Sequence, residues 1–274
     1  MKNFWTLTEG MFYCLIDEQR TLHLKRAIET AVAPGDVVVD AGSGSGILAL
    51  MALAAGARTV YAIENDAISL DGLHRIAARD PRLIVLQGDA GRVRLPEKVD
   101  VIIAELIATG LIGEFQVPVM NNLLKSATPD VKVIIQGYRC TADLVEQKNS
   151  YYGHTLDIVR YEYPEFPELV SRSLTTGQVY LDVDFRKPVR RRVVRAELSL
   201  EGIASGTTNG LRISGETLFF GGATMGGSFA YSYPVILPLE PLVVEPGGRY
   251  RGHLSYRLCG GFKSVSYGVV PTLT

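Results

Sequence analysis

Glycines and acidic residues gather where short apolar runs end in the first half of this 274-residue chain. The stretch 40–46 reads DAGSGSG: Asp40 opens it, and Gly42, Gly44 and Gly46 follow at even spacing. Glycines let a backbone approach a ligand closely and adopt positive φ, and the amides at the start of a helix favour a carboxylate. The pattern predicts a loop that cradles the carboxylate end of a cofactor.

Two further acids stand at the ends of expected strands, where the ligands of parallel sheets bind. Glu64 ends the run 59–63 and is placed to accept both hydroxyls of a ribose, and Asp89 follows the run 83–86 and could accept from an adenine amine. Asp40 can accept from an ammonium group, directly or through water. S-adenosylmethionine (SAM) carries all these groups. An NAD enzyme is the rival, but its Gly-x-Gly-x-x-Gly spacing fits this loop poorly.

The elements that must position these residues alternate between strand and helix. Helical periodicity is expected over 17–33, 47–55, 67–79 and 115–126, and strands over 37–39, 59–63, 83–86, 99–104 and 132–136. This order predicts βαβ units and a Rossmann-like, doubly wound, mostly parallel sheet.

The character of the chain changes after about residue 150. Short alternating runs are separated by Gly-rich and Pro-rich breaks, which predicts an antiparallel β-barrel or sandwich. The expected strands are 179–185, 193–200, 211–219, 235–244, 249–258 and 264–270. The sequence therefore predicts an α/β fold with a SAM-binding domain over 1–145 and a β-rich substrate-binding domain over 146–274.

The first half resembles the protein arginine methyltransferases. The resemblance rests on residues 38–48, 54–58 and 62–64, and on Asp17-Glu18-Gln19-Arg20-Thr21, which is similar to that family's Asp-x-x-Arg-Thr motif. It covers residues 10–140 well and the second half more weakly. In the family this arginine holds the SAM carboxylate, so the resemblance implies that role for Arg20.

The resemblance also assigns a catalytic pair, Glu105 and Glu114. They are nine positions apart after the expected strand 99–104, the spacing of the family's double-glutamate loop, whose carboxylates hold the substrate guanidinium. Carboxylates meet the donor fork of a guanidinium in bidentate pairs. Localising the charge on one nitrogen leaves another able to attack the sulfonium methyl, and positioning supplies much of the rate. The alternative is two loop or helix-cap acids on a solvated surface.

Some positions depart from the family pattern. The family's Tyr-Phe-x-x-Tyr helix before the core is not visible, and its Thr-His-Trp loop falls at 229–231, where histidine is absent and Tyr231 replaces tryptophan. Gln116 stands where the family has methionine, and the dimerisation arm is reduced or missing over 150–180. Residues 11–13 are candidates for a lid over the cofactor, and the aromatic stretch 161–166 for the wall of a substrate cleft.

The composition limits the classes of partner that the protein is expected to bind. The net charge is −1 and the pI about 6.4, so nothing global attracts nucleic acid or an anionic membrane. The basic run 186–195 could contact phosphates, but charges that block strand-edge pairing are the favoured interpretation. The four histidines lack metal-ligand spacing, and the three cysteines are far apart. With no apolar signal core in residues 1–5, a cytoplasmic location without a membrane anchor is expected.

Together these patterns predict a SAM-dependent methyltransferase that resembles arginine N-methyltransferases. Its acceptor would be a guanidino nitrogen of a protein, a peptide or a small molecule, and nucleic acid is not expected. A homodimer, the family's usual assembly, is left open by the reduced arm. Two other interpretations also remain: a methyltransferase for a different small molecule or for RNA, and a SAM-binding regulatory protein without catalysis.

Overall fold

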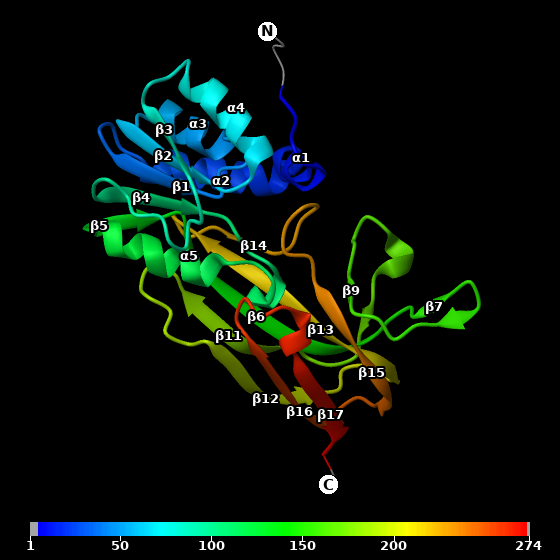
Figure 1. Cartoon of the computed structure of the whole chain (residues 1–274). Coiled ribbons are helices and arrows are strands. Elements are labelled where there is room, and N and C mark those ends of the chain that lie inside the picture. The colour runs from blue at the N-terminus through cyan, green and yellow to red at the C-terminus, as the bar shows by residue number, and fades with distance from the viewer. Residues whose placement is uncertain (1–4, 273–274) are drawn as a thin grey trace.

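The computed structural model describes residues 5–272. Its first half is built on a five-stranded parallel sheet (Figure 1). The strand order is β3-β2-β1-β4-β5. The strands are β1 (Val37–Ala41), β2 (Thr59–Glu64), β3 (Leu83–Gln87), β4 (Val99–Ala104) and β5 (Ala127–Val133). β1 and β2 are buried along their whole length, as is typical of parallel strands covered on both faces. The expected doubly wound core is confirmed.

Helix α2 (Glu18–Ala31) precedes β1, and three helices connect strands of the sheet. They are α3 (Ile47–Ala54), α4 (Ala67–Ala77) and α5 (Gln116–Leu123), the last continued by η2 (Leu124–Ser126). α2 and α4 begin at aspartates whose side chains accept first-turn amide hydrogens, Asp17 from Arg20 and Asp66 from Ser69. Each expected helix is present, with ends displaced by a few residues.

A further helix, α1 (Glu9–Ile16), lies before the core, where the sequence had indicated none. It begins at Thr8, whose side chain accepts the N–H of Met11. None of its residues is buried, and Phe12 and Ile16 are about half exposed. It therefore lacks the buried apolar stripe that makes a helix visible in a periodicity pattern.

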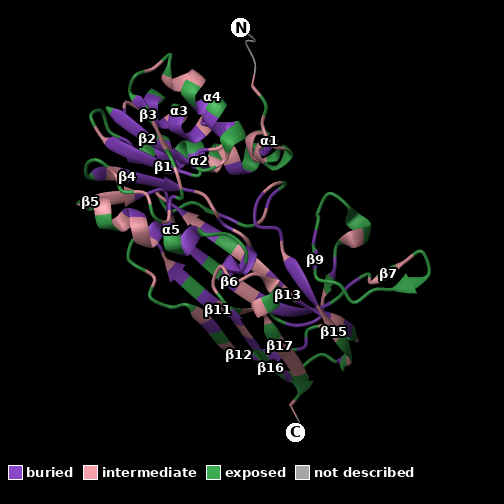
Figure 2. Cartoon of the chain, viewed as in Figure 1, coloured by how far each residue is buried: buried purple, intermediate pink, exposed green. Residues whose placement is uncertain are grey.

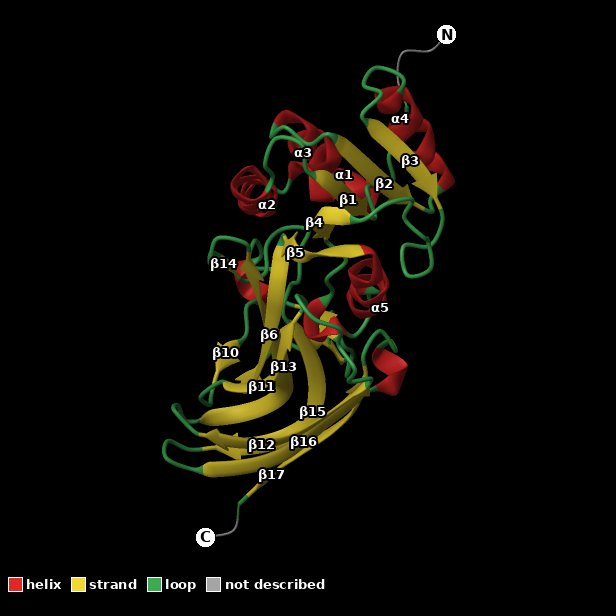
Figure 3. Cartoon of the chain, turned by 90° about the vertical axis from the view of Figure 1, so that its left-hand side faces the viewer, coloured by secondary structure: helices red, strands yellow, loops and turns green. Residues whose placement is uncertain are grey.

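The second half is antiparallel, as expected, and its long strands curve around one another (Figure 3). One sheet contains β6 (Ile135–Glu146), β9 (Arg160–Tyr161), β10 (Arg172–Ser173), β11 (Gln178–Asp184), β13 (Gly206–Phe219), β14 (Thr224–Met225) and β15 (Val235–Val244). The other contains β12 (Val193–Glu201), β16 (Arg249–Arg257) and β17 (Ser266–Pro271). Buried residues line the inner faces of both halves (Figure 2).

The expected single strand 132–136 is two strands. β5 ends at Val133 in the parallel sheet, and β6 begins at Ile135 in the antiparallel one. Residues 133–135 are all buried and apolar, so the pattern gives no sign of the change of sheet. The division expected between residues 145 and 146 remains a prediction, and the pairing of β6 with β13 favours a division near residue 134.

Residues 147–171 form a short projecting segment that returns to the seven-stranded sheet at β9, where the sequence indicated a reduced or missing arm (Figure 1). Its elements are β7 (Ser150–Tyr151), β8 (His154–Thr155), β9 and η3 (Pro167–Leu169). Tyr152, at the turn of the β7–β8 hairpin, is fully exposed. Within residues 5–272, no helix is long and apolar enough to cross a membrane.

Candidate functional site

The glycine loop joins β1 to α3 at the carboxyl end of the parallel sheet. Gly42, Gly44 and Gly46 have φ of 73°, 51° and 78°, the left-handed region that favours glycine. The N–H groups of Gly42 and Ser43 both donate to the carbonyl of Ile63 on the neighbouring strand. A Cβ on Gly42 would lie 2.8 Å from Leu106 Cδ2, so a side chain there would displace the segment that follows β4.

Glu64 ends β2 and holds this loop. Its Oε2 accepts the N–H of Gly44 at 2.8 Å, and its Oε1 accepts the N–H groups of Asn65 and Asp66 at 2.7 and 2.8 Å. The residue is 7% exposed. The carboxylate predicted to grip a ribose is thus fixed by three amide donors, which leave its remaining lone pairs for a ligand.

Asp40 carries an unsatisfied buried oxygen. The residue is 1% exposed, and within residues 5–272 its Oδ2 has no hydrogen-bond partner. Burial raises the pKa of its carboxyl from 3.8 to about 7. Such an orphan acceptor at a strand exit is the site at which an ammonium donor of a ligand would be stabilised.

The raised pKa of Asp40 makes stability depend on pH. The folded state binds the Asp40 proton more tightly than the unfolded state does. The contribution of this carboxyl to the free energy of unfolding therefore falls as pH rises from about 4 to about 7, and it stays constant at higher pH. In Asp40→Asn this pH-dependent loss is absent. The free energy of unfolding of the variant relative to that of the wild type should therefore rise across this pH window, by a few kcal/mol at most. Urea unfolding between pH 4 and pH 8 without cofactor measures it.

The control for this pH series is Asp130→Asn, a change at an exposed position. We expect the difference between this control and the wild type to stay constant with pH. If the free energies of unfolding of Asp40→Asn and the wild type also differ by an amount that does not change with pH, that result would contradict a buried proton-binding group at position 40.

Arg20 and Glu105 form a buried ion pair between α2 and the segment after β4. Arg20 Nε donates to Glu105 Oε2 at 2.6 Å, and Nη2 donates to the same oxygen. Nη1 donates to the carbonyl of Cys14 at 3.0 Å. The side chains are 7% and 8% exposed, so the pair is shielded from water. The residue expected to hold the cofactor carboxylate therefore contacts the residue expected to hold the acceptor.

A cavity of about 350 Å³ brings most of the expected site residues together, a volume suited to a small ligand. Arg20, Gly42, Gly44, Glu64, Glu105 and Glu114 all line it. Asp40 and Gly46 are not in the lining: Asp40 is only 1% exposed, and a Cβ on Gly46 would contact Leu73 of α4. Asp89 also stays outside, because its carboxylate accepts the N–H of Gly91 and pairs with Arg92. Its contact with adenine remains a prediction.

The structure adds residues that the sequence did not single out. Cys14 and Ala230 line the cavity, and so does Met11, in the segment expected to cover the cofactor. Asp17 accepts from Ser228 Oγ at 2.7 Å and from the N–H of Ala230 at 2.8 Å, which fastens the barrel loop to the start of α2. Only the position of Asp17 in the Asp-x-x-Arg-Thr motif could have signalled this.

Gln116 is another residue whose role the sequence left open. It is fully buried, its Oε1 accepts the N–H of Leu106, and its Nε2 donates to the carbonyl of Ala104, both at 2.9 Å. The side chain therefore bridges the two backbone groups on either side of Glu105. A methionine has no N–H donor and only a weak sulfur acceptor, so it could not form this bridge.

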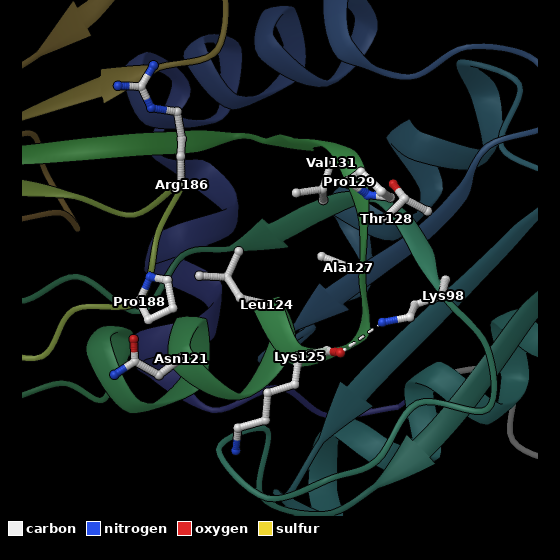
Figure 4. A pocket seen from close by; sticks show the side chains of 10 residues that line it. All are labelled: Lys98, Asn121, Leu124, Lys125, Ala127, Thr128, Pro129, Val131, Arg186 and Pro188. Carbon is white, nitrogen blue, oxygen red and sulfur yellow. Dashed lines mark hydrogen bonds between the residues drawn. The ribbon is translucent and has the colours of Figure 1, made fainter.

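A second cavity, of about 590 Å³, lies apart from these residues, between α5, β5 and the segment after β11 (Figure 4). Half of its ten lining residues are aliphatic, and Lys98, Lys125 and Arg186 are among the others. Lys98 Nζ donates to the carbonyl of Lys125, and Arg186 pairs with Asp184. None of the expected cofactor or acceptor residues lines it, so the smaller cavity is the candidate active site.

Comparisons with known proteins point to methyl transfer. Residues 20–138 match the family model "Ribosomal protein L11 methyltransferase (PrmA)". The chain is 35% identical over 257 residues to the uncharacterised protein MJ1452 of Methanocaldococcus jannaschii, and the match covers 92% of this chain and 93% of that one. It is 44% identical over 84 residues to a probable histone-arginine methyltransferase CARM1 of Oryza sativa subsp. indica. That match spans 29% of this chain and 16% of the rice protein.

A solved structure shares the whole fold. The Trypanosoma brucei PRMT1 enzyme-prozyme heterotetrameric complex with AdoHcy superposes with a TM-score of 0.73 at 18% identity. The superposition covers 95% of this chain and 96% of the trypanosome chain. Both the parallel core and the antiparallel half therefore have counterparts in that protein.

Proposed function

We propose that this chain, which belongs to one family with protein MJ1452 and is a SAM-dependent methyltransferase resembling the protein arginine methyltransferases, methylates a guanidino nitrogen. The observation that carries the acceptor class is the placement of Glu105 and Glu114 in the cavity that the glycine loop also lines. Two carboxylates facing one cavity suit a planar cation with several N–H donors.

The residues present fit SAM as the cofactor. Arg20 and the amides at the start of α3 would hold its carboxylate, and Glu64 its ribose. Asp40 is buried outside the cavity lining, so its orphan oxygen would hold the ammonium group through a bridging water. When bound, SAM supplies an electrophilic methyl group on its sulfonium. The positive φ of Gly42, Gly44 and Gly46 and the close approach of Leu106 to Gly42 favour glycine at these positions, as a backbone that must approach a ligand requires.

The two glutamates have different surroundings, which suggests different tasks. Glu105 is paired with Arg20 and also accepts the N–H of Ile107. Glu114 is exposed at the cavity, and its carboxylate has no hydrogen bond or ion pair within residues 5–272. Glu105 would orient the guanidinium, and Glu114 would complete the grip. Methylation of a guanidinium releases one proton, which the free carboxylate of Glu114 is placed to accept.

Transfer of labelled methyl groups tests this function. The purified chain is incubated with radiolabelled SAM and a panel of arginine-containing peptides, free arginine, other guanidino compounds, lysine peptides and RNA. We expect label in the guanidino compounds only, and none with Glu114→Gln under the same conditions. Label in RNA or in lysine peptides would contradict a guanidino acceptor and identify another acceptor class. SAM binding without transfer to any acceptor would favour a regulatory protein.

The projecting segment 147–171 is the part of the surface that we propose for a homodimer. It presents Tyr152, Leu156 and Ile158 to solvent, at a place where a packed partner would cover them. Sedimentation velocity at increasing concentration measures the assembly, and a monomer at all concentrations would contradict it. The cytoplasmic location expected from residues 1–5 also remains a prediction, and residues 1–4 lie outside the described part of the chain.

A further inference from the structure

The loop that carries the two glutamates has a backbone that needs support from its surroundings. We call residues 105–114 the acceptor loop, which contains η1 (Thr109–Leu111). Gly110 and Leu111 have φ of 70° and 55°, and Leu111 is fully buried. A leucine rarely adopts this left-handed conformation, and such residues persist only where neighbouring groups over-determine them.

The β-barrel supplies that support through residues 256–261, which we call the barrel turn. Tyr256 Oη donates to the carbonyl of Gly110 at 2.7 Å. The N–H of Cys259 donates to the carbonyl of Leu111 at 2.9 Å, and the N–H of Gly261 to that of Ile112 at 2.8 Å. Three successive carbonyls of the acceptor loop are thus held by one turn, and the last of them is two residues before Glu114.

The other end of the acceptor loop is held by the parallel core. Gln116, at the start of α5, bridges the backbone on either side of Glu105, and Arg20 of α2 pairs with the Glu105 carboxylate. The barrel turn makes none of these contacts. Glu105 is therefore fixed by the parallel core, whereas the residues that lead to Glu114 are also bonded to the barrel turn.

We propose that Tyr256 and the barrel turn are positioning elements that place Glu114 relative to Glu105, so that the docking of the barrel sets the spacing of the acceptor grip. The proposal rests on the proposed function for its consequence in catalysis. The barrel then acts on the reaction through the backbone of the acceptor loop, in addition to any contact it makes with substrate.

The variant Tyr256→Phe tests this by removing one hydrogen bond while keeping the ring. We expect kcat on a guanidino acceptor to fall about tenfold, because small displacements of a reacting geometry are costly, while the dissociation constant for SAM is unchanged. Hydrogen–deuterium exchange of residues 109–114 should become faster in this variant, and that of the glycine loop 42–46 should not change.

Tyr267→Phe is the matched control. Tyr267 Oη donates to the carbonyl of Pro238 at 2.7 Å, which lies outside the acceptor loop. We expect its kcat and the exchange of residues 109–114 to remain at wild-type values.

Several outcomes would overturn the proposal. Unchanged exchange of residues 109–114 in Tyr256→Phe would remove the link between turn and loop, and unchanged kcat would remove its consequence. A parallel loss of SAM affinity would reveal a general structural role instead. If the wild type methylates no guanidino compound, the proposed function fails, and the exchange comparison alone then decides whether the turn fixes the loop.

Discussion

Replacing Glu114 with glutamine should lower methyl transfer by about a factor of 10² to 10³ while leaving SAM binding intact. A carboxamide keeps the shape of the side chain but loses the charge that meets the guanidinium and the site that accepts its proton. Within residues 5–272, Glu114 forms no hydrogen bond or ion pair with the glycine loop or with Arg20, so we expect the cofactor half of the cavity to keep its structure. Turnover with labelled SAM and calorimetric titration of SAM measure the two effects.

Glu168→Gln serves as its control, because Glu168 is an exposed glutamate of η3 outside the cavity. It should leave turnover unchanged. Full activity of Glu114→Gln on the guanidino acceptor would contradict the two-carboxylate grip. An equal loss of SAM binding would show that the residue supports the cavity as a whole.

Glu64→Gln should raise the dissociation constant for SAM by about two orders of magnitude, although it is an isosteric change. Both oxygens of Glu64 accept backbone N–H groups, one from Gly44 and two from Asn65 and Asp66. A glutamine has a single acceptor oxygen, so its NH₂ group must face an N–H donor in either orientation. The glycine loop would lose a contact that shapes it, in addition to the lost bond to a ribose.

Calorimetric titration of SAM measures this effect, with Glu97→Gln as the matched control. Glu97 also accepts on both oxygens, from Arg58 and from Tyr61, but it does so at the surface and away from the cavity. That variant should bind SAM as the wild type does. If Glu64→Gln binds SAM with unaltered affinity, the proposed role of this carboxylate in cofactor binding is contradicted.

Local patterns in the sequence predicted most of the elements. The strands 99–104 and 235–244 have the expected bounds, and the second does so although Pro238 and Pro241 lie inside it. The exposed helix α1 and the passage from β5 to β6 were not predicted. The first has no buried stripe, and the second occurs inside a continuous buried run. Hydrophobic periodicity follows the burial pattern of a segment, so it gives no sign of a boundary where burial does not change.

The site was predictable to the extent that its residues lie close in sequence. The glycine loop, Glu64 and the pair Glu105 and Glu114 follow from short motifs. The contact of Arg20 with Glu105 spans 85 positions, and the bond from Tyr256 to Gly110 spans 146. No local pattern encodes such contacts, because they depend on how the barrel packs against the core.

The lining of the candidate cavity holds one arginine and three glutamates, so its ionised side chains leave an excess of negative charge. A guanidinium and SAM each carry a net positive charge, and such a cavity concentrates both. After transfer the methyl group and its positive charge have left the cofactor, and the spent S-adenosylhomocysteine is neutral overall. The electrostatic attraction that gathers the reactants therefore weakens for the spent cofactor, which favours its departure and makes turnover sensitive to ionic strength.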